Sequence, residues 1–430
     1  MGCCNSKTVS DKYKSREIKH NEKGKSEFGE IDDFARKAPE ELKTSAEALV
    51  QYMLSKTKDH RQLVRGFFVW IAENIRYDIE GLLGQRPRAP TDVSSVMKNG
   101  LSVCEGYASV METVCRSAGI EVKKLSGFSK GLGYSTDKKI TTSSATDHAW
   151  NAVRLDGKWF LLDSTWGAGY SDGQTFIKAF DEFYFLTDPV MFVNDHFPYM
   201  NHNMSESMKW QLLKNPISLE HFNNNVQLKS HAFVLNVTPV SHKRGHIVMN
   251  DEIQLIFKSQ NILRFSARLS HFDGNSFREM LNSTFANSKS GVSFITVHPR
   301  IVGKYRLDIF AQHRTDEGRL HQVAVYSIQC DSVKDSTFEF PKVFKSDYTD
   351  ECQIIQPKNA RLLANSEVVF EINAPHLNSI SVNDEMLQGK GGKFRGTIKT
   401  HKEGVSYTVN AVFREGSTTH FRGMFQFYTC

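Results

Sequence analysis

The sequence predicts an α+β domain followed by two all-β sandwich domains. Apolar residues recur at helical spacings up to residue 117, short strands joined by a hairpin turn follow, and the chain beyond residue 223 alternates as strands do. A chain of 430 residues also exceeds what one hydrophobic core usually supports. We expect a basic tail and three domains, with the bounds 1–28, 29–216, 223–332 and 336–430.

Composition limits the class of protein. The chain is 40% hydrophobic and 24% charged, and no apolar run approaches the ~18 residues of a membrane-spanning helix, so we expect none. The net charge of +6 is modest, and basic and aromatic residues form no stripe, so nucleic acid is not an expected partner. Seven cysteines are too sparse for a disulfide scaffold and fit a reducing, intracellular compartment.

The N-terminus carries a pattern typical of lipid anchoring. Gly2, with Ser6 behind it, matches the myristoylation signal, and Cys3 and Cys4 offer sites for palmitoylation. A second lipid matters because one myristoyl chain binds membranes only marginally. Residues 1–26 hold seven Lys or Arg against three Asp or Glu, a net charge of +4 that favours anionic lipid. We expect the cytoplasmic face of a membrane, the plasma membrane first; the alternative is a disordered tail with a chance match.

Three helical segments open the α+β domain. Helical periodicity starts at Ile31, and a second helix follows Asp59 as N-cap and runs to Tyr77. A third helix is expected from Val103 to Ser117, ended by Gly119.

Strands and one hairpin follow the third helix. Residues 122–128 read as a strand and residues 129–144 as a polar loop, and two strands flank the turn dipeptide Asp156-Gly157. Helical character returns at residues 209–213.

The hairpin turn fixes which residues face each other. A two-residue turn pairs Leu155 with Lys158, so paired residue numbers sum to 313 and His148 lies opposite Thr165. Asp163 then becomes the diagonal neighbour of His148 on the same face of the sheet, within reach of its imidazole.

The β-rich remainder repeats itself. Tyr305 and Tyr407 each follow a glycine and open a strand, and a further strand after each ends at Cys330 or Cys430. The tyrosine-to-cysteine separations of 25 and 23 residues predict two similar immunoglobulin-like sandwiches.

Three segments together indicate cysteine chemistry: Val103-Cys104-Glu105-Gly106-Tyr107-Ala108, Asp147-His148-Ala149-Trp150-Asn151 and Leu162-Asp163-Ser164-Thr165-Trp166. Thiols at helix N-termini ionise more readily, and the amides there can bind an oxyanion. The order predicts a catalytic triad with Cys104 as nucleophile, His148 as base and Asp163 as the group that orients the base.

Each residue taken alone has a simpler interpretation. Cys104 could be an inert thiol, His148 a strand histidine with a satisfied hydrogen bond, and Asp163 a residue that ends a strand. The three could also bind zinc, but no Cys-x-x-Cys or His-x₃₋₅-His spacing supports this, so we expect no metal and no cofactor. For Trp166 we favour a hydrophobic lid over a substrate gate.

The three segments, in this order, resemble the transglutaminase-like superfamily, which is related in mechanism to papain-type cysteine peptidases. Further segments resemble the kyphoscoliosis peptidase and hillarin-type family, over residues 31–216: Val69–Asp78, Phe183–Pro189, His196-Phe197-Pro198 and Trp210–Leu213. The resemblance implies a papain-like α+β catalytic domain with the triad Cys104, His148 and Asp163, and an association with the cytoskeleton.

The leading hypothesis is acyl transfer from protein amides through a Cys104 thioester. Transfer to water would make the protein a peptidase or deamidase, and transfer to an amine a crosslinking transglutaminase; the motifs leave both open. The alternative is a membrane-anchored scaffold that binds cytoskeletal proteins, which an unchanged cellular phenotype of Cys104→Ala would favour.

Overall fold

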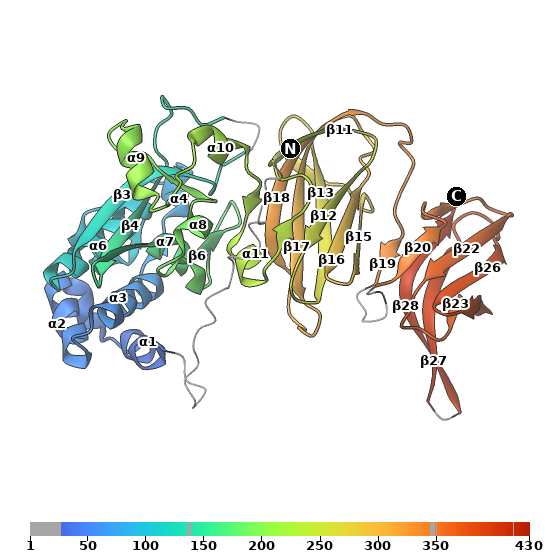
Figure 1. Ribbon diagram of the computed structural model, residues 1–430, viewed down its shortest axis with the longest axis horizontal. Coiled ribbons are helices and arrows are strands. Elements are labelled where there is room, and N and C mark those ends of the chain that lie inside the picture. The colour runs from blue at the N-terminus through green and yellow to red at the C-terminus, as the bar shows by residue number, and fades with distance from the viewer. Residues whose placement is uncertain (1–26, 136–138, 345–348, 350, 416) are drawn as a thin grey trace, which may run out of the picture. The chain divides into compact units, whose positions relative to one another are not determined.

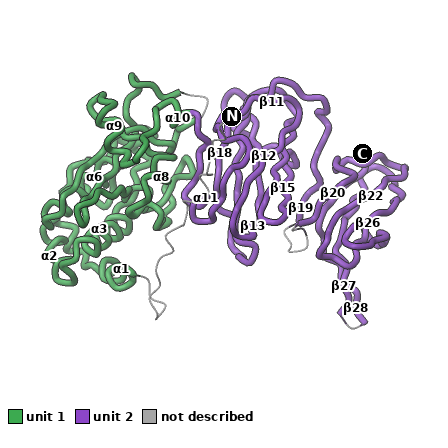
Figure 2. The backbone as a smooth tube through the Cα atoms, in the orientation of Figure 1, with its two compact units in different colours: residues 1–223 green, residues 224–430 purple. Residues whose placement is uncertain are grey.

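A computed structural model describes residues 27–135, 139–344, 349, 351–415 and 417–430. The chain divides into two compact units, residues 1–223 and residues 224–430, which Figure 2 colours green and purple. The first unit mixes helices with a small sheet, and the second consists almost entirely of strands (Figure 1). The predicted fold class, an α+β domain followed by β-sandwiches, is confirmed.

The helices of the first unit are α1 Gly29–Arg36, η2 Glu40–Thr44, α2 Ala46–Lys56, α3 His60–Asn74, α4 Ile79–Leu82, α5 Val93–Asn99, α6 Cys104–Ser117, α7 Ser164–Ala168, η3 Glu182–Tyr184, α8 Pro189–Phe192, α9 Met204–Trp210 and α10 Leu219–Asn224. Its strands are β1 Arg76–Tyr77, β2 Leu101–Ser102, β3 Val122–Ser129, β4 His148–Leu155, β5 Lys158–Leu162, β6 Gly169–Ser171, β7 Phe176–Lys178 and β8 His196–Pro198. In the part of the chain that the structure describes, no helix has the length and apolar character needed to cross a bilayer.

Helix α3 begins where the sequence predicts, because the Asp59 carboxylate accepts the Gln62 N–H at 2.8 Å. Its predicted end at Tyr77 is wrong. The helix stops at Asn74, and Tyr77 instead lies in β1, which pairs in parallel with β2. A contact with a strand 25 residues further along the chain therefore overrides local helical periodicity.

The central sheet has the order β5-β4-β3-β8, with antiparallel neighbours. Helix α6 packs against β3 and β4, and α3 packs against α6, as Figure 1 shows. The largest side chains of this core that are fully buried include Trp70, Tyr107 and Trp150. The helix that begins with Cys104 is thus fixed against the strand that begins with His148.

The β4–β5 hairpin has the predicted register. Leu155 pairs with Lys158 and Asn151 with Leu162, so the paired numbers sum to 313. The predicted pairing of His148 with Thr165 is wrong, because β5 ends at Leu162 and Thr165 lies in α7.

The described strands of the second unit form two pairs of sheets. In the first pair, six strands follow the order β11-β18-β17-β13-β14 with β9 beside β18, and four follow β10-β12-β16-β15. In the second pair, six strands follow β19-β28-β27-β23-β24 with β21 beside β28, and four follow β20-β22-β26-β25.

The strands of the first pair of sheets are β9 Gln227–Leu228, β10 Thr238–Pro239, β11 His246–Asn250, β12 Ile253–Lys258, β13 Leu263–Phe272, β14 Phe277–Glu279, β15 Thr284–Lys289, β16 Val292–Val297, β17 Gly303–His313 and β18 His321–Ser332. The short helix α11 Ser230–Val234 lies between β9 and β10. The later strands are β19 Lys342–Val343, β20 Gln353–Gln356, β21 Arg361–Leu362, β22 Glu367–Asn373, β23 Ile380–Val382, β24 Glu385–Met386, β25 Gln388–Lys390, β26 Lys393–Lys399, β27 Ser406–Glu415 and β28 Thr418–Thr429.

The two tyrosines of the sequence repeat occupy equivalent places. Tyr305 donates its hydroxyl to the Ile301 carbonyl and accepts the Ile301 N–H at 3.2 Å, while Tyr407 accepts the His401 N–H at 2.7 Å. A tyrosine hydroxyl bonded to the backbone a few residues upstream is the corner typical of immunoglobulin-like sandwiches. The predicted tyrosine strands are both present, whereas the strands after them do not end at the cysteines: β18 runs two residues past Cys330, and β28 stops one residue before Cys430.

Candidate active site

Cys104 is the first residue of α6, a helix of 14 residues. Its N-cap, Val103, has extended backbone and no side-chain hydrogen bond to the helix, so amide groups of the first turn remain available to an anion. The Cys104 thiol is free and half-buried. This position suits a nucleophile that a substrate must reach.

His148 and Asp163 meet at the open end of the hairpin. The His148 Nε2 lies 2.7 Å from Asp163 Oδ2, and both residues are buried, at 7% and 0% exposure. Asp163 also caps α7, since its Oδ1 accepts the N–H groups of Thr165 and Trp166 at 2.8 and 3.1 Å. The carboxylate is therefore held at one oxygen while it bonds the imidazole with the other.

Burial disfavours the charged forms of His148 and Asp163, and their opposite charges offset that effect. Burial by itself lowers the pKa of His148, but the charge and hydrogen bond of Asp163, and then those of Cys104, hold it well above its usual value. Burial by itself raises the pKa of Asp163, but the charge and hydrogen bond of His148, and then those of His196, hold it below its usual value. The arrangement favours an imidazolium between a carboxylate and the thiol.

A second histidine bonds the same carboxylate. The His196 Nε2 lies 3.0 Å from Asp163 Oδ2, and its Nδ1 lies 2.7 Å from Asp195 Oδ1. Sequence reasoning placed His196 in a resembling segment but gave it no role. The signal available was an adjacent acid and base, Asp195-His196, at the start of a short strand.

Trp166 packs against both imidazoles. Its ring centroid lies 5.1 Å from that of His148 and 4.4 Å from that of His196. Gly131 also lies close to Trp166, since a Cβ there would come within 2.9 Å of the indole. Trp166 is half-buried in this place, and its role as a hydrophobic lid stays a prediction.

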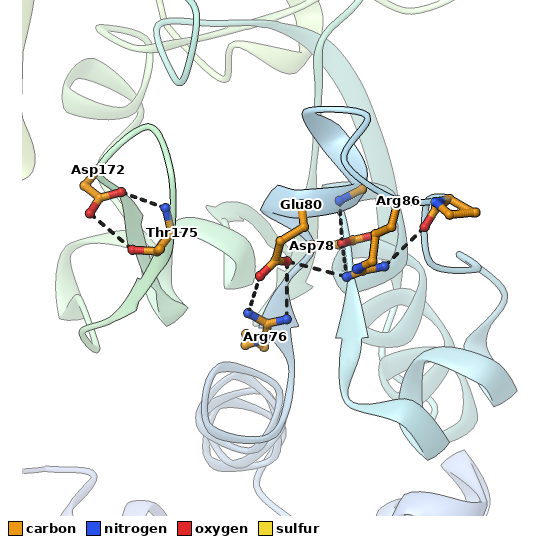
Figure 3. Close-up of polar contacts among 8 residues, drawn as sticks. Arg76, Asp78, Glu80, Arg86, Asp172 and Thr175 are labelled. Carbon is orange, nitrogen blue, oxygen red and sulfur yellow. Dashed lines mark hydrogen bonds and ion pairs between the residues drawn. The ribbon is translucent and has the colours of Figure 1, made fainter.

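Asp78 links the segment that follows it to the strand that leads to Cys104, and Figure 3 shows its carboxylate paired with Arg86. Its backbone N–H donates to the Ser102 carbonyl at 2.9 Å. Its buried carboxylate accepts the Gly81 and Ala89 N–H groups at 3.0 and 2.7 Å and pairs with the Arg86 guanidinium. The segment from Asp78 to Ala89 is thereby anchored two residues from the nucleophile.

Two smaller contacts in the same view hold their own turns. Arg76 pairs with Glu80 at 3.0 Å on the exposed side of the Asp78 network, and the Asp172 carboxylate accepts the Thr175 N–H at 2.7 Å in the β6–β7 turn (Figure 3).

Among the described residues, His148, Asp163 and His196 form a buried group that could hold a metal ion, since their ligand atoms lie within 4.8 Å of one another. Those same atoms are already joined by hydrogen bonds from the two rings to one carboxylate oxygen. A metal would have to replace the bonds that orient His148, so the donor set fits a hydrogen-bonded cluster better than a metal centre.

The structure brings Cys104, His148 and Asp163 into one cluster, in which the contact between His148 and Asp163 is the one that the hairpin register predicts. The lipidation residues Gly2, Cys3 and Cys4 lie outside the described residues.

Known families match two parts of the chain. Residues 47–164 match the transglutaminase-like superfamily, a range that contains Cys104, His148 and Asp163. Residues 219–342 match the KY-like, immunoglobulin-like domain. His196 lies between the two ranges.

The chain is also similar to curated proteins. The chain is 33% identical to human kyphoscoliosis peptidase over 316 residues (71% of this chain, 44% of the relative), and 33% identical to the mouse protein over 297 residues (68% and 42%). It is 25% identical to Drosophila melanogaster hillarin over 322 residues (68% and 37%). The chain spans less than half the length of each of these relatives. The chain thus contains a domain of the transglutaminase-like superfamily followed by a KY-like, immunoglobulin-like domain, and it is similar to kyphoscoliosis peptidase and hillarin.

Proposed function

We propose that the protein is a cysteine-dependent acyl-transfer enzyme that acts on protein substrates, cytoskeletal proteins among them, at the cytoplasmic face of a membrane. The single observation that carries the proposal is the buried His148–Asp163 hydrogen bond beside a half-buried thiol at a helix N-terminus. A nucleophile, a base and a group that orients the base are the parts that such chemistry needs.

In the proposed acylation step the Cys104 sulfur attacks an amide carbonyl carbon and forms a C–S bond. The amide groups at the start of α6 stabilise the negative charge on the carbonyl oxygen. His148, as imidazolium, gives its proton to the amide nitrogen, the C–N bond breaks and the amine or ammonia leaves. A thioester on Cys104 and a neutral His148 remain.

In the second step His148 takes a proton from an incoming water or amine, which attacks the thioester carbon. The C–S bond breaks, and Cys104 leaves as the thiolate beside the restored imidazolium. Water gives a carboxylic acid, and an amine gives a new amide. Access of water past Trp166 decides between a peptidase or deamidase and a crosslinking enzyme.

The test measures the alkylation rate of Cys104 against pH by peptide mass spectrometry, in the wild type and in His148→Ala. We expect fast labelling below about pH 7 in the wild type, which collapses in the variant because the imidazolium that stabilises the thiolate is lost. Slow labelling that rises only near about pH 8.5, alike in both proteins, would mean an ordinary thiol. The scaffold function would then be preferred.

The membrane site is proposed from the tail pattern alone. Gly2→Ala should release the protein from membranes in cell fractionation, because it removes the myristoylated residue. The matched variant Cys3→Ser with Cys4→Ser should keep transient binding, since the myristoyl chain and the basic residues remain. Continued membrane residence of Gly2→Ala would count against lipid anchoring.

A further inference from the structure

The carboxylate that orients His148 is shared with a second buried histidine. His196 opens β8, where it pairs with Ser129 at the end of β3, and its side chain is 0% exposed. Its Nε2 lies 3.0 Å from Asp163 Oδ2, the same oxygen that His148 Nε2 approaches at 2.7 Å. Two imidazoles thus converge on one carboxylate oxygen.

The other nitrogen of His196 also faces a carboxylate. Its Nδ1 lies 2.7 Å from Asp195 Oδ1, and Asp195 Oδ2 accepts the Tyr184 hydroxyl at 3.2 Å. A neutral imidazole carries one N–H, so one of its nitrogens would present a lone pair to a carboxylate oxygen. An imidazolium donates from both nitrogens and satisfies both contacts.

We propose that His196 is a protonated positioning residue, which clamps Asp163 and lessens the negative charge that Asp163 presents to His148. This inference rests on the proposed acyl transfer and deepens it. The cluster becomes a row of alternating charges: imidazolium at His148, carboxylate at Asp163, imidazolium at His196 and carboxylate at Asp195.

The surroundings of His196 agree with a charged ring. Several titratable groups lie near it in the described residues: Asp163 just after β5, His148 on β4, Asp195 before β8, Tyr184 at the end of η3 and Asp147 before β4. Lys130, which follows β3, has its ammonium over the rings of Tyr134 and Phe222, at 5.5 and 4.8 Å from their centroids. Burial alone lowers the pKa of His196, but Asp195 and Asp163 together raise it.

A positive charge on His196 would lower the proton affinity of His148. The centroids of the two imidazole rings are 5.3 Å apart, close enough for repulsion between two positive charges. His148 therefore holds its proton less tightly than it would with Asp163 to itself. The benefit for acyl transfer is that an imidazolium stabilising the thiolate can still release its proton to the leaving amine.

The test compares His196→Gln with His202→Gln, an exposed histidine that lies outside the cluster. Glutamine keeps an N–H for Asp163 and removes the charge. We expect nitrogen NMR of histidine-labelled protein to show the His148 imidazolium surviving to about one pH unit higher in His196→Gln. Because a positive charge near the thiolate is lost, Cys104 should also ionise at a higher pH. Its alkylation at pH 6 should therefore be several-fold slower. His202→Gln should match the wild type in both measurements.

Asp195→Asn removes the negative charge beside His196 but keeps a hydrogen-bond partner for its Nδ1. It is the second variant, for use if His196→Gln does not fold. The asparagine amide can donate to Nδ1, so His196 keeps its N–H to Asp163 as a neutral ring, and the alkylation profile should move in the same direction by a smaller step. In the wild type at pH 7 both nitrogens of His196 should give protonated signals. A single protonated nitrogen there, or variants that melt earlier with unmoved pH profiles, would overturn the inference.

The two proposals fail in different ways. A wild-type Cys104 that labels as an ordinary thiol defeats acyl transfer, whereas the protonation of His196 is read directly from its own nitrogens. If Cys104 is activated but the pH dependence of its alkylation is the same in His196→Gln, only the positioning role of His196 is contradicted.

Discussion

Asp163→Asn should slow acyl transfer, and the alkylation of Cys104 at neutral pH, by up to about 10⁴-fold, the loss that the same change causes in a Ser-His-Asp triad. In the wild type Asp163 Oδ1 accepts two backbone N–H groups. The oxygen of an asparagine would stay there, so its NH₂ group would face the Nε2 of His148. His148 would then be a neutral ring with its N–H on the nitrogen beside Cys104. It could neither accept the proton of the thiol there nor offer the thiolate a positive charge.

Asp147→Asn is the matched control, because it makes the same change next to His148 in the chain. The Asp147 carboxylate accepts the Ser129 N–H at 2.8 Å, which an asparagine oxygen can also do. Its labelling rate should fall much less than that of Asp163→Asn, since Asp147 acts on His148 through its charge, whereas Asp163 also bonds the ring. A rate for Asp163→Asn within tenfold of the wild type would show that His148 is oriented without the carboxylate.

The pH dependence of stability gives a second readout for Asp163. Because the folded-state pKa is held below its ordinary value, Asp163 contributes stability above about pH 4, and that stability is lost as the pH falls through the depressed value. Asp163→Asn removes the titrating group, so its free energy of unfolding should depend less steeply on pH between about 4 and 2 than that of the wild type.

Arg65→Met should destabilise the first unit by about 3–5 kcal/mol, the usual cost of leaving a buried charge without its partner. The Arg65 side chain is 3% exposed, and its guanidinium bonds both oxygens of Asp32 at 2.7 Å and both oxygens of Glu182 at 2.6–2.7 Å. Methionine fills the space but leaves the carboxylate of Asp32, 11% exposed, without a counter-charge.

Tryptophan fluorescence during urea unfolding measures this effect in the full chain. All five tryptophans, Trp70, Trp150, Trp159, Trp166 and Trp210, lie in residues 1–223, so their signal follows the first unit. Arg36→Met is the control: Arg36 pairs with Glu73 at 3.3 Å while 41% exposed, and such a pair contributes at most about 1 kcal/mol. Equal midpoints for the two variants would contradict the role of Arg65.

Arg65→Met should also disturb the active site. Glu182 begins η3, and Tyr184 at its end accepts the Asp163 N–H with its carbonyl at 3.0 Å and donates its hydroxyl to Asp195. Arg65 therefore supports the segment that positions both carboxylates, and Arg65→Met should label more slowly at Cys104 even below the unfolding transition.

Much of the candidate site was predictable from local features. A two-residue turn at Asp156-Gly157 fixes the pairing of the strands on either side, so simple arithmetic brings Asp163 to His148. The start of α6 at Cys104 follows from a helical pattern that is complete within 15 residues. Local geometry of this kind needs no knowledge of the rest of the chain.

Local competition decided what the arithmetic could not. The extension of the hairpin to Thr165 was wrong because the Asp163 carboxylate bonds the amides of Thr165 and Trp166 and begins a helix instead of continuing the strand. The end of α3 was wrong for a longer-range reason, since Tyr77 finds its partner in Ser102.

By itself the sequence determined the fold class, the hairpin register and the meeting of His148 with Asp163, because each depends on neighbours in the chain. Only the tertiary structure brought His196 to Asp163, 33 residues away, through the pairing of β8 with β3. No periodicity records such a contact. A hydrogen bond between distant segments depends on how the whole sheet is assembled, and the sharing of one carboxylate by two histidines was decided there.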